Sequence, residues 1–126
     1  MEELKFTKTH EWVKLEDDLA TVGITEYAQK SLGDVVFVEL PKKGKEVKQF
    51  LPFAVVESTK TAADVYAPLS GHIVEVNDDL KNSPQLVNED PFGKGWLVKI
   101  KAINLDEINN LLDEASYNEF LKTQEH

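Results

Sequence analysis

The chain has 126 residues, 41% of them hydrophobic, and a formal net charge of −9 from 14 lysines and 23 acidic residues. This length and apolar content predict one folded domain, residues 1–126, and the negative charge disfavours nucleic acid or an anionic membrane surface as a partner. No cysteine occurs, which excludes disulfides, thiolate catalysis and cysteine-bound metals and fits a reducing compartment.

The ends of the chain and its hydropathy favour a cytoplasmic protein. No apolar run reaches membrane-spanning length, and MEELKFTKTHEW at the N-terminus has neither a signal-peptide core nor an arginine-rich presequence. We therefore expect a monomeric bacterial protein of the cytoplasm, and leave open a processed mitochondrial form.

Three strands are predicted in the first third of the chain. Residues 12–15 and 19–24 alternate apolar and polar side chains and are joined by an acidic turn at 16–18, which is typical of a hairpin. Residues 35–40 are apolar on both faces. A strand of that kind is usually buried on both sides, so we expect it in the centre of the fold.

A short helix and a polar connection are predicted around these strands. Thr25 is a suitable N-cap for a helix that ends at Leu32, with Gly33 just past its end. Residues 42–48 are polar and surround a glycine, which indicates a loop. The apolar Phe50 follows, and we expect it to cover an edge of the core.

The stretch from about residue 53 to 76 is predicted to form three strands joined by two turns. Lys60 lies at the first turn, and Pro68 and Gly71 mark the second. Most lysines are simply solvated surface charges, and 14 occur in this chain. It is the position at the tip of a β-hairpin that makes Lys60 a candidate site.

The last part of the chain is predicted to hold one strand and several helical turns. Ser83 and Pro84 suit the start of a helical turn, and residues 96–102 alternate as an amphipathic strand. Residues of about 104–123 form a helical extension. Its two expected capping boxes are Asn104 with Glu107, and Ser116 with Glu119. Together these elements predict a mostly β fold with short helices.

Residues 57–71, ESTKTAADVYAPLSG, resemble the lipoyl-lysine segment of the glycine cleavage system H-protein family. Five further segments resemble that family in the same order: HEW at 10–12, VGITEYAQ at 22–29, LGDVVFVELP at 32–41, GWLVKIK at 95–101 and LLDEASY at 111–117. The family usually has a glycine near Phe50, so the local backbone there is a point of departure. The resemblance implies a lipoyl/biotinyl-type barrel-sandwich hybrid with external and C-terminal helices.

The resemblance also implies a function and a set of partners. Lys60 would carry covalent lipoate, added by a lipoate ligase or octanoyltransferase. The chain would be a carrier and not an enzyme, shuttling an aminomethyl group from glycine decarboxylase, the P protein, to the aminomethyltransferase, the T protein. Dihydrolipoamide dehydrogenase, the L protein, would reoxidise it. By the same resemblance, Thr9, Glu11 and Asp64 would hold the loaded arm against the carrier.

Two other roles are compatible with this hairpin, one if Lys60 is lipoylated and one if it is not. The chain could be a lipoyl or octanoyl relay that donates to other lipoate-dependent complexes, or an unmodified interaction domain.

Biotin domains usually place their lysine between methionines, whereas the only methionine here is Met1. Lipoyl domains of 2-oxoacid dehydrogenases usually carry D-K-A and lack the C-terminal extension.

Three kinds of chemistry are disfavoured by the residues themselves. Glu57 and Asp64 could pair for acid–base catalysis, but a chain with 23 acidic residues offers such pairs by chance. His10, His72 and His126 have no metal-ligand spacing. No phosphate-binding glycine motif occurs. We therefore expect neither catalytic residues nor a metal site.

Overall fold

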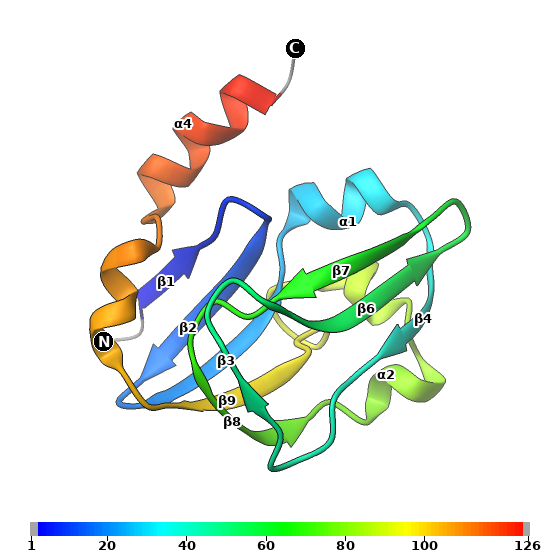
Figure 1. Cartoon of the computed structure of the whole chain (residues 1–126). Helices are drawn as coiled ribbons and strands as arrows, with labels where there is room; N and C mark the ends of the chain where they lie inside the picture. The colour runs from blue at the N-terminus through cyan, green and yellow to red at the C-terminus, as the bar shows by residue number, and fades with distance from the viewer. Residues whose placement is uncertain (1–2, 125–126) are drawn as a thin grey trace.

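The computed structural model describes residues 3–124, which form two antiparallel sheets with short helices around them (Figure 1). The six-stranded sheet has, in spatial order, β1 (Glu3–Phe6), β2 (Glu11–Glu16), β3 (Leu19–Ile24), β9 (Val98–Ala102), β8 (Gly71–Val76) and β5 (Glu46–Val47). The three-stranded sheet has β4 (Val35–Glu39), β6 (Pro52–Ser58) and β7 (Ala62–Tyr66). The helices are α1 (Glu26–Leu32), α2 (Asp79–Asn82), α3 (Leu86–Glu89), the 3-10 helix η1 (Leu105–Asn110) and α4 (Glu114–Gln124). This content confirms the prediction of a mostly β fold with short helices.

The core is formed by alternate residues of both sheets. The alternation predicted for residues 19–24 is seen in β3, where Ala20, Val22 and Ile24 are all buried, and in β9 Val98 and Ile100 are buried too. A strand places every second side chain on one face, so these positions share one side of the six-stranded sheet. None of the helices described between residues 3 and 124 is both long and apolar enough to span a membrane.

The predicted boundaries of α1 are confirmed. The Thr25 hydroxyl accepts a hydrogen bond from the Ala28 amide at 3.3 Å, and the Gly33 amide closes the helix by donating to Gln29. Gly33 has φ 83°, a conformation open to glycine and costly for residues with a β-carbon. This helix lies beside the β6–β7 hairpin in Figure 1.

The prediction that residues 35–40 form a central, doubly buried strand is wrong. Strand β4 is an edge of the small sheet and pairs only with β6. Val36 and Phe37 are 53% and 52% exposed, because an irregularity in the pairing between Val35 and Phe37 turns both side chains outward. The apolar side chains of residues 35–40 did not indicate that one face of the strand has no other layer packed on it.

Several short elements were not predicted, and one helix begins later than expected. Strand β1 and the two-residue β5 inside the polar connection form by pairing with β2 and β8, and helix α2 is the third element that was not predicted. Helix α3 begins at Leu86, with Gln85 as its N-cap, so Ser83 and Pro84 form the turn before it. Val87 is buried as expected, and Leu86 packs against the core.

Neither predicted capping box forms in the C-terminal segment. Asn104 does accept from the Asp106 amide, but the Glu107 carboxylate binds Ser70 instead, at 2.7 Å from both its amide and its hydroxyl. Asp113 accepts from the Ser116 amide at 2.8 Å, where Ser116 had been expected to be the cap itself. In the first case a half-buried partner from another segment, Ser70, competed successfully with the local bond.

Candidate functional site

Lys60 lies in a tight turn between β6 and β7. The Ser58 amide donates to the Thr61 carbonyl at 2.8 Å, and the Ser58 hydroxyl accepts from the amides of Lys60 and Thr61. The Thr59 amide donates to the Asp34 carbonyl at 3.0 Å, which joins the hairpin tip to the end of α1. The backbone under Lys60 is therefore fixed from two sides.

The Lys60 side chain is exposed and lies along the end of α1. Within residues 3–124 it has no ion pair or side-chain hydrogen bond. A β-carbon placed on Gly33 would come within 3.2 Å of the Lys60 Cε. The missing side chain at Gly33 thus leaves room beside the lysine for an attached chain.

A cavity of about 180 Å³ lies between α1, β7 and the turn that joins β1 to β2. We call it the cleft. It is lined by Thr9, His10, Glu11, Ile24, Ala28, Ser31, Leu32, Val56, Ala63, Asp64 and Val65. The structure therefore brings together Thr9, Glu11 and Asp64, the three residues that the sequence resemblance implicated in arm docking.

Glu11 is the most constrained of the three. Its side chain is 1% exposed, and Oε1 accepts from the Thr7 hydroxyl at 2.5 Å and from the Thr9 hydroxyl. Oε2 accepts from the Tyr66 amide of β7 at 3.0 Å. Burial raises the pKa of Glu11, and the hydrogen bonds from Thr7, Thr9 and Tyr66 oppose that rise. Glu11 therefore brings a buried carboxyl group, held by these hydrogen bonds, to the lining of the cleft.

Asp64 and Thr9 complete the polar part of the cleft in different ways. Asp64 is exposed on β7 and has no ion pair with the described part of the chain. Thr9 is also exposed, but its hydroxyl proton is directed at Glu11. The cleft thus combines an apolar wall with a buried and an exposed carboxylate, which suits an aliphatic chain that ends in a cation.

Sequence reasoning missed three contributors to the cleft. The Tyr66 amide holds Glu11, and Ala28 and Leu32 of α1 supply part of the apolar wall. The capping pattern at Thr25 predicted that α1 exists. It carried no information on which side of α1 faces β7, because that follows from the packing of the hairpin.

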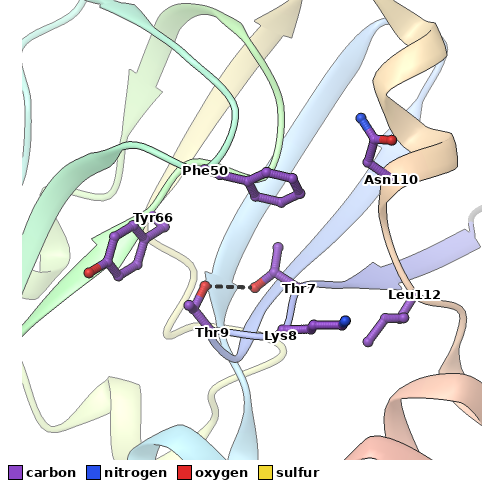
Figure 2. Close-up of a pocket in the computed structure, with 7 residues that line it drawn as sticks. All are labelled: Thr7, Lys8, Thr9, Phe50, Tyr66, Asn110 and Leu112. Carbon is purple, nitrogen blue, oxygen red and sulfur yellow. Dashed lines mark hydrogen bonds between the residues drawn. The ribbon is translucent and has the colours of Figure 1, made fainter.

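A second cavity, of about 480 Å³, shares Thr9 with the cleft as a lining residue (Figure 2). It is lined by Thr7, Lys8, Thr9, Phe50, Tyr66, Asn110 and Leu112. Phe50 is 46% exposed and forms one wall, so the expectation that it covers an edge of the core is wrong. Its φ of 67° is the physical reason why a glycine suits this position better.

The two histidines in the described part of the chain, His10 and His72, do not belong to a cluster of metal-binding side chains. Within residues 3–124 there is no group of three or more histidine, cysteine, aspartate or glutamate side chains placed to hold a metal ion. His10 contacts Tyr117 and Tyr27, while His72 lies on β8. His126 is outside the described residues.

Comparisons with known proteins agree across almost the whole chain. The family model described as "Glycine cleavage H-protein" matches residues 4–124. A glycine cleavage system H protein of Thermotoga maritima is 59% identical over 116 residues, 92% of this chain and 94% of the relative. That of Symbiobacterium thermophilum is 53% identical over 120 residues, 95% of this chain and 94% of the relative.

A solved structure supports the same relationship at the level of the fold. The crystal structure of a glycine cleavage system H protein from Mycobacterium marinum has a TM-score of 0.85 and 37% sequence identity to this chain. The match covers 97% of this chain and 96% of that one. The expected lipoyl-type fold class, with its C-terminal helix, is thereby confirmed.

Proposed function

The chain belongs to the glycine cleavage H-protein family, and from that premise we propose that it is a single lipoyl-carrier domain with Lys60 as the attachment residue. The observation that carries the proposal is the lysine at the tip of the β6–β7 hairpin, exposed and held from both sides. An enzyme that acylates one lysine among 14 needs a distinctive backbone shape to recognise, and this tip provides one.

The residues around Lys60 fit lipoate. Gly33 leaves space along the lysine chain, and the cleft between α1 and β7 offers an apolar wall for an aliphatic arm. When attached, lipoate supplies a disulfide that accepts an aminomethyl group from glycine and later passes it on. The chain itself supplies attachment, protection from water and a site for the charged end of its cargo.

Glu11 and Asp64 have distinct roles in holding that cargo. Glu11 presents a buried acceptor fixed by Thr7, Thr9 and Tyr66, and a fixed acceptor in a site shielded from water binds an ammonium group more strongly than a solvated one does. Asp64 adds an exposed negative charge at the mouth of the cleft. Thr9 orients Glu11 through its hydroxyl.

The partners follow from the family and the attached group. We propose glycine decarboxylase as the enzyme that loads the carrier, the aminomethyltransferase as the one that unloads it, and dihydrolipoamide dehydrogenase as the one that reoxidises it. A lipoate ligase or octanoyltransferase would modify Lys60. The bacterial origin of the relatives supports a bacterial cytoplasmic location, and we propose that the carrier acts as a monomer and is not itself an enzyme.

Substitution of the cleft carboxylates tests the proposed holding of the cargo. Glu11→Gln and Asp64→Asn each remove a negative charge and keep the shape of the side chain. We expect faster loss of the carried aminomethyl group as ammonia and formaldehyde, with Glu11→Gln having the larger effect because its acceptor is shielded from water. The lifetime is measured in the lipoylated carrier, loaded by glycine decarboxylase and then separated from it.

Asp18→Asn is the matched control for these variants. Asp18 is a surface acid that pairs with Lys101 at 3.7 Å and does not line the cleft. Its substitution should leave the lifetime unchanged, and all variants should accept lipoate on Lys60 at the wild-type rate. Equal lifetimes in wild type, Glu11→Gln and Asp64→Asn would show that these carboxylates do not hold the cargo.

A further inference from the structure

Helix α4 packs on the rest of the molecule through Tyr117, with the partly buried Phe120 and Leu121 beside it. It has eleven residues, yet Tyr117 is the one α4 residue that is buried. In Figure 1 the helix extends away from the two sheets. The Tyr117 ring stacks on Phe6 at a centroid distance of 4.6 Å. Tyr117 is therefore the α4 residue whose polar group is most withdrawn from water, and its contacts indicate what it does.

The Tyr117 hydroxyl joins two segments that lie far from it in sequence. It is 2.8 Å from His10 Nδ1 and 2.7 Å from the Thr25 hydroxyl. Tyr117 is 4% exposed, so little water is available to replace either bond. Removing the hydroxyl would leave two polar atoms with lost partners in a largely buried place.

One of these segments is the turn that forms the N-terminal wall of the cleft. His10 lies between Thr9 and Glu11 and has φ 71°, an uncommon conformation for a residue with a side chain. Its amide donates to the Thr7 carbonyl at 3.2 Å, and its own carbonyl accepts from the Thr25 amide at 3.0 Å. Because His10 lies between them, a shift of His10 would change the directions of the Thr9 and Glu11 side chains.

The other segment is the start of helix α1, which forms another part of the cleft wall. Thr25 is the N-cap of α1, and its hydroxyl also accepts from the Ala28 amide. Ala28 and Leu32 of the same helix line the cleft. The Tyr117 hydroxyl is thus bonded at once to the turn and to the N-cap of the helix, two neighbouring segments that both contribute to the cleft.

We propose that Tyr117 is a positioning residue for the cleft, through which the C-terminal helix holds the His10 turn and the start of α1 at the separation that arm docking requires. The inference rests on the proposed function of the cleft, and it assigns a role to the conspicuous LLDEASY segment that carrier chemistry alone leaves without one. Tyr117 acts through His10 and Thr25 and does not line the cleft itself.

The first test uses the unmodified protein and requires no lipoate. Tyr117→Phe removes only the bridging hydroxyl. Tyr27→Phe is the matched control, because the Tyr27 ring also packs on His10, at 4.5 Å, but its hydroxyl has no hydrogen bond within the described part of the chain. Amide hydrogen exchange at Thr25 and Ala28 should become about fivefold faster in Tyr117→Phe, the effect of losing one ordinary hydrogen bond.

Exchange in the sheet core separates positioning from general stability. In Tyr117→Phe the amide of Leu97, which bonds to Val22 at 2.8 Å, should exchange as in wild type. The inference is overturned if Thr25 and Ala28 exchange at the wild-type rate, or if the core amides accelerate to the same extent. It is also overturned if Tyr27→Phe has the same effect as Tyr117→Phe.

The second test measures the lifetime of the carried group in the lipoylated protein. Tyr117→Phe should shorten it about fivefold, with lipoylation of Lys60 unchanged, and should shorten it no further in a Glu11→Gln background, because the hydroxyl acts through the cleft. A full additional effect in that background would refute action through the cleft. If the lifetime is short in Glu11→Gln but unchanged in Tyr117→Phe, the proposed role of Tyr117 is overturned and the proposed function of the cleft is not. If the lifetime is unchanged in both variants, both proposals are overturned.

Discussion

Phe50 allows a backbone property of this chain to be measured separately from its side chain. Its φ of 67° is in the left-handed region, and its amide is bonded to the Ala67 carbonyl at 2.7 Å, so the turn cannot easily relax. Phe50→Gly and Phe50→Ala both remove the ring from the wall of the larger cavity. They differ in whether the residue that remains tolerates positive φ and in the freedom of the unfolded chain.

The expected difference can be worked from these two effects. A residue with a β-carbon costs about 1–2 kcal/mol in the left-handed region. Glycine costs about 0.5–1 kcal/mol through its greater freedom in the unfolded chain. The free energy of unfolding should therefore be about 1 kcal/mol higher for Phe50→Gly than for Phe50→Ala, or about 4 °C in Tm for a domain of this size.

Urea unfolding followed by circular dichroism gives the two free energies. Leu51 is the control position, because it is 53% exposed and does not have positive φ. There the order should reverse, with Leu51→Ala more stable than Leu51→Gly. If Phe50→Ala is as stable as Phe50→Gly, the backbone at residue 50 is not strained and the reasoning is refuted.

Two further predictions concern pH and salt. Burial lowers the pKa of His10 from the model-compound value of 6.5, so the folded state binds its proton less readily than the unfolded chain does, and stability should fall as pH falls below 6.5. His10→Asn, which tolerates positive φ, should lose part of that pH dependence in urea unfolding at pH 7.5 and 5.5; an identical slope would contradict the assignment. With a net charge of −9, association with the aminomethyltransferase should slow several-fold as salt rises from about 50 to 500 mM in stopped-flow mixing, and a rate indifferent to salt would exclude steering by net charge.

Signals confined to neighbouring residues predicted the ends of α1 and the inward face of β3. Thr25 and Gly33 bound α1 because capping depends on a hydroxyl and a positive φ at fixed positions. The alternation in β3 predicted its inward face for the same kind of local reason. These features require no knowledge of what the segment packs against.

The missed features all depend on distant partners. Val36 and Phe37 are as apolar as core residues, and only the absence of a covering layer leaves them exposed. Glu107 had a suitable local partner in Asn104, but Ser70 offers it two donors at once. The sequence pattern of one segment does not show whether a distant residue will replace a local hydrogen-bond partner.

The residues of the candidate site were predicted, but their burial and hydrogen bonds were not. The family resemblance named Thr9, Glu11 and Asp64, and the structure places all three around one cleft. The burial of Glu11 and its bond from Tyr66 were not foreseen, because both arise where β7 crosses the N-terminal turn. The role of Tyr117 was not foreseen either, because its hydroxyl contacts His10 and Thr25, which are 107 and 92 residues away in sequence.

The central claim is that one lysine, Lys60, carries the prosthetic group. Its most direct test is peptide mapping by mass spectrometry after incubation of the purified chain with lipoate ligase, ATP and lipoate, beside Lys60→Arg treated in the same way. Arginine keeps the exposed positive charge but cannot form the lipoyl amide. We predict a mass increase of one lipoyl group, located on Lys60, and no increase in Lys60→Arg. Modification of another lysine, such as Lys81 or Lys94, or an undiminished increase in Lys60→Arg, would contradict the account.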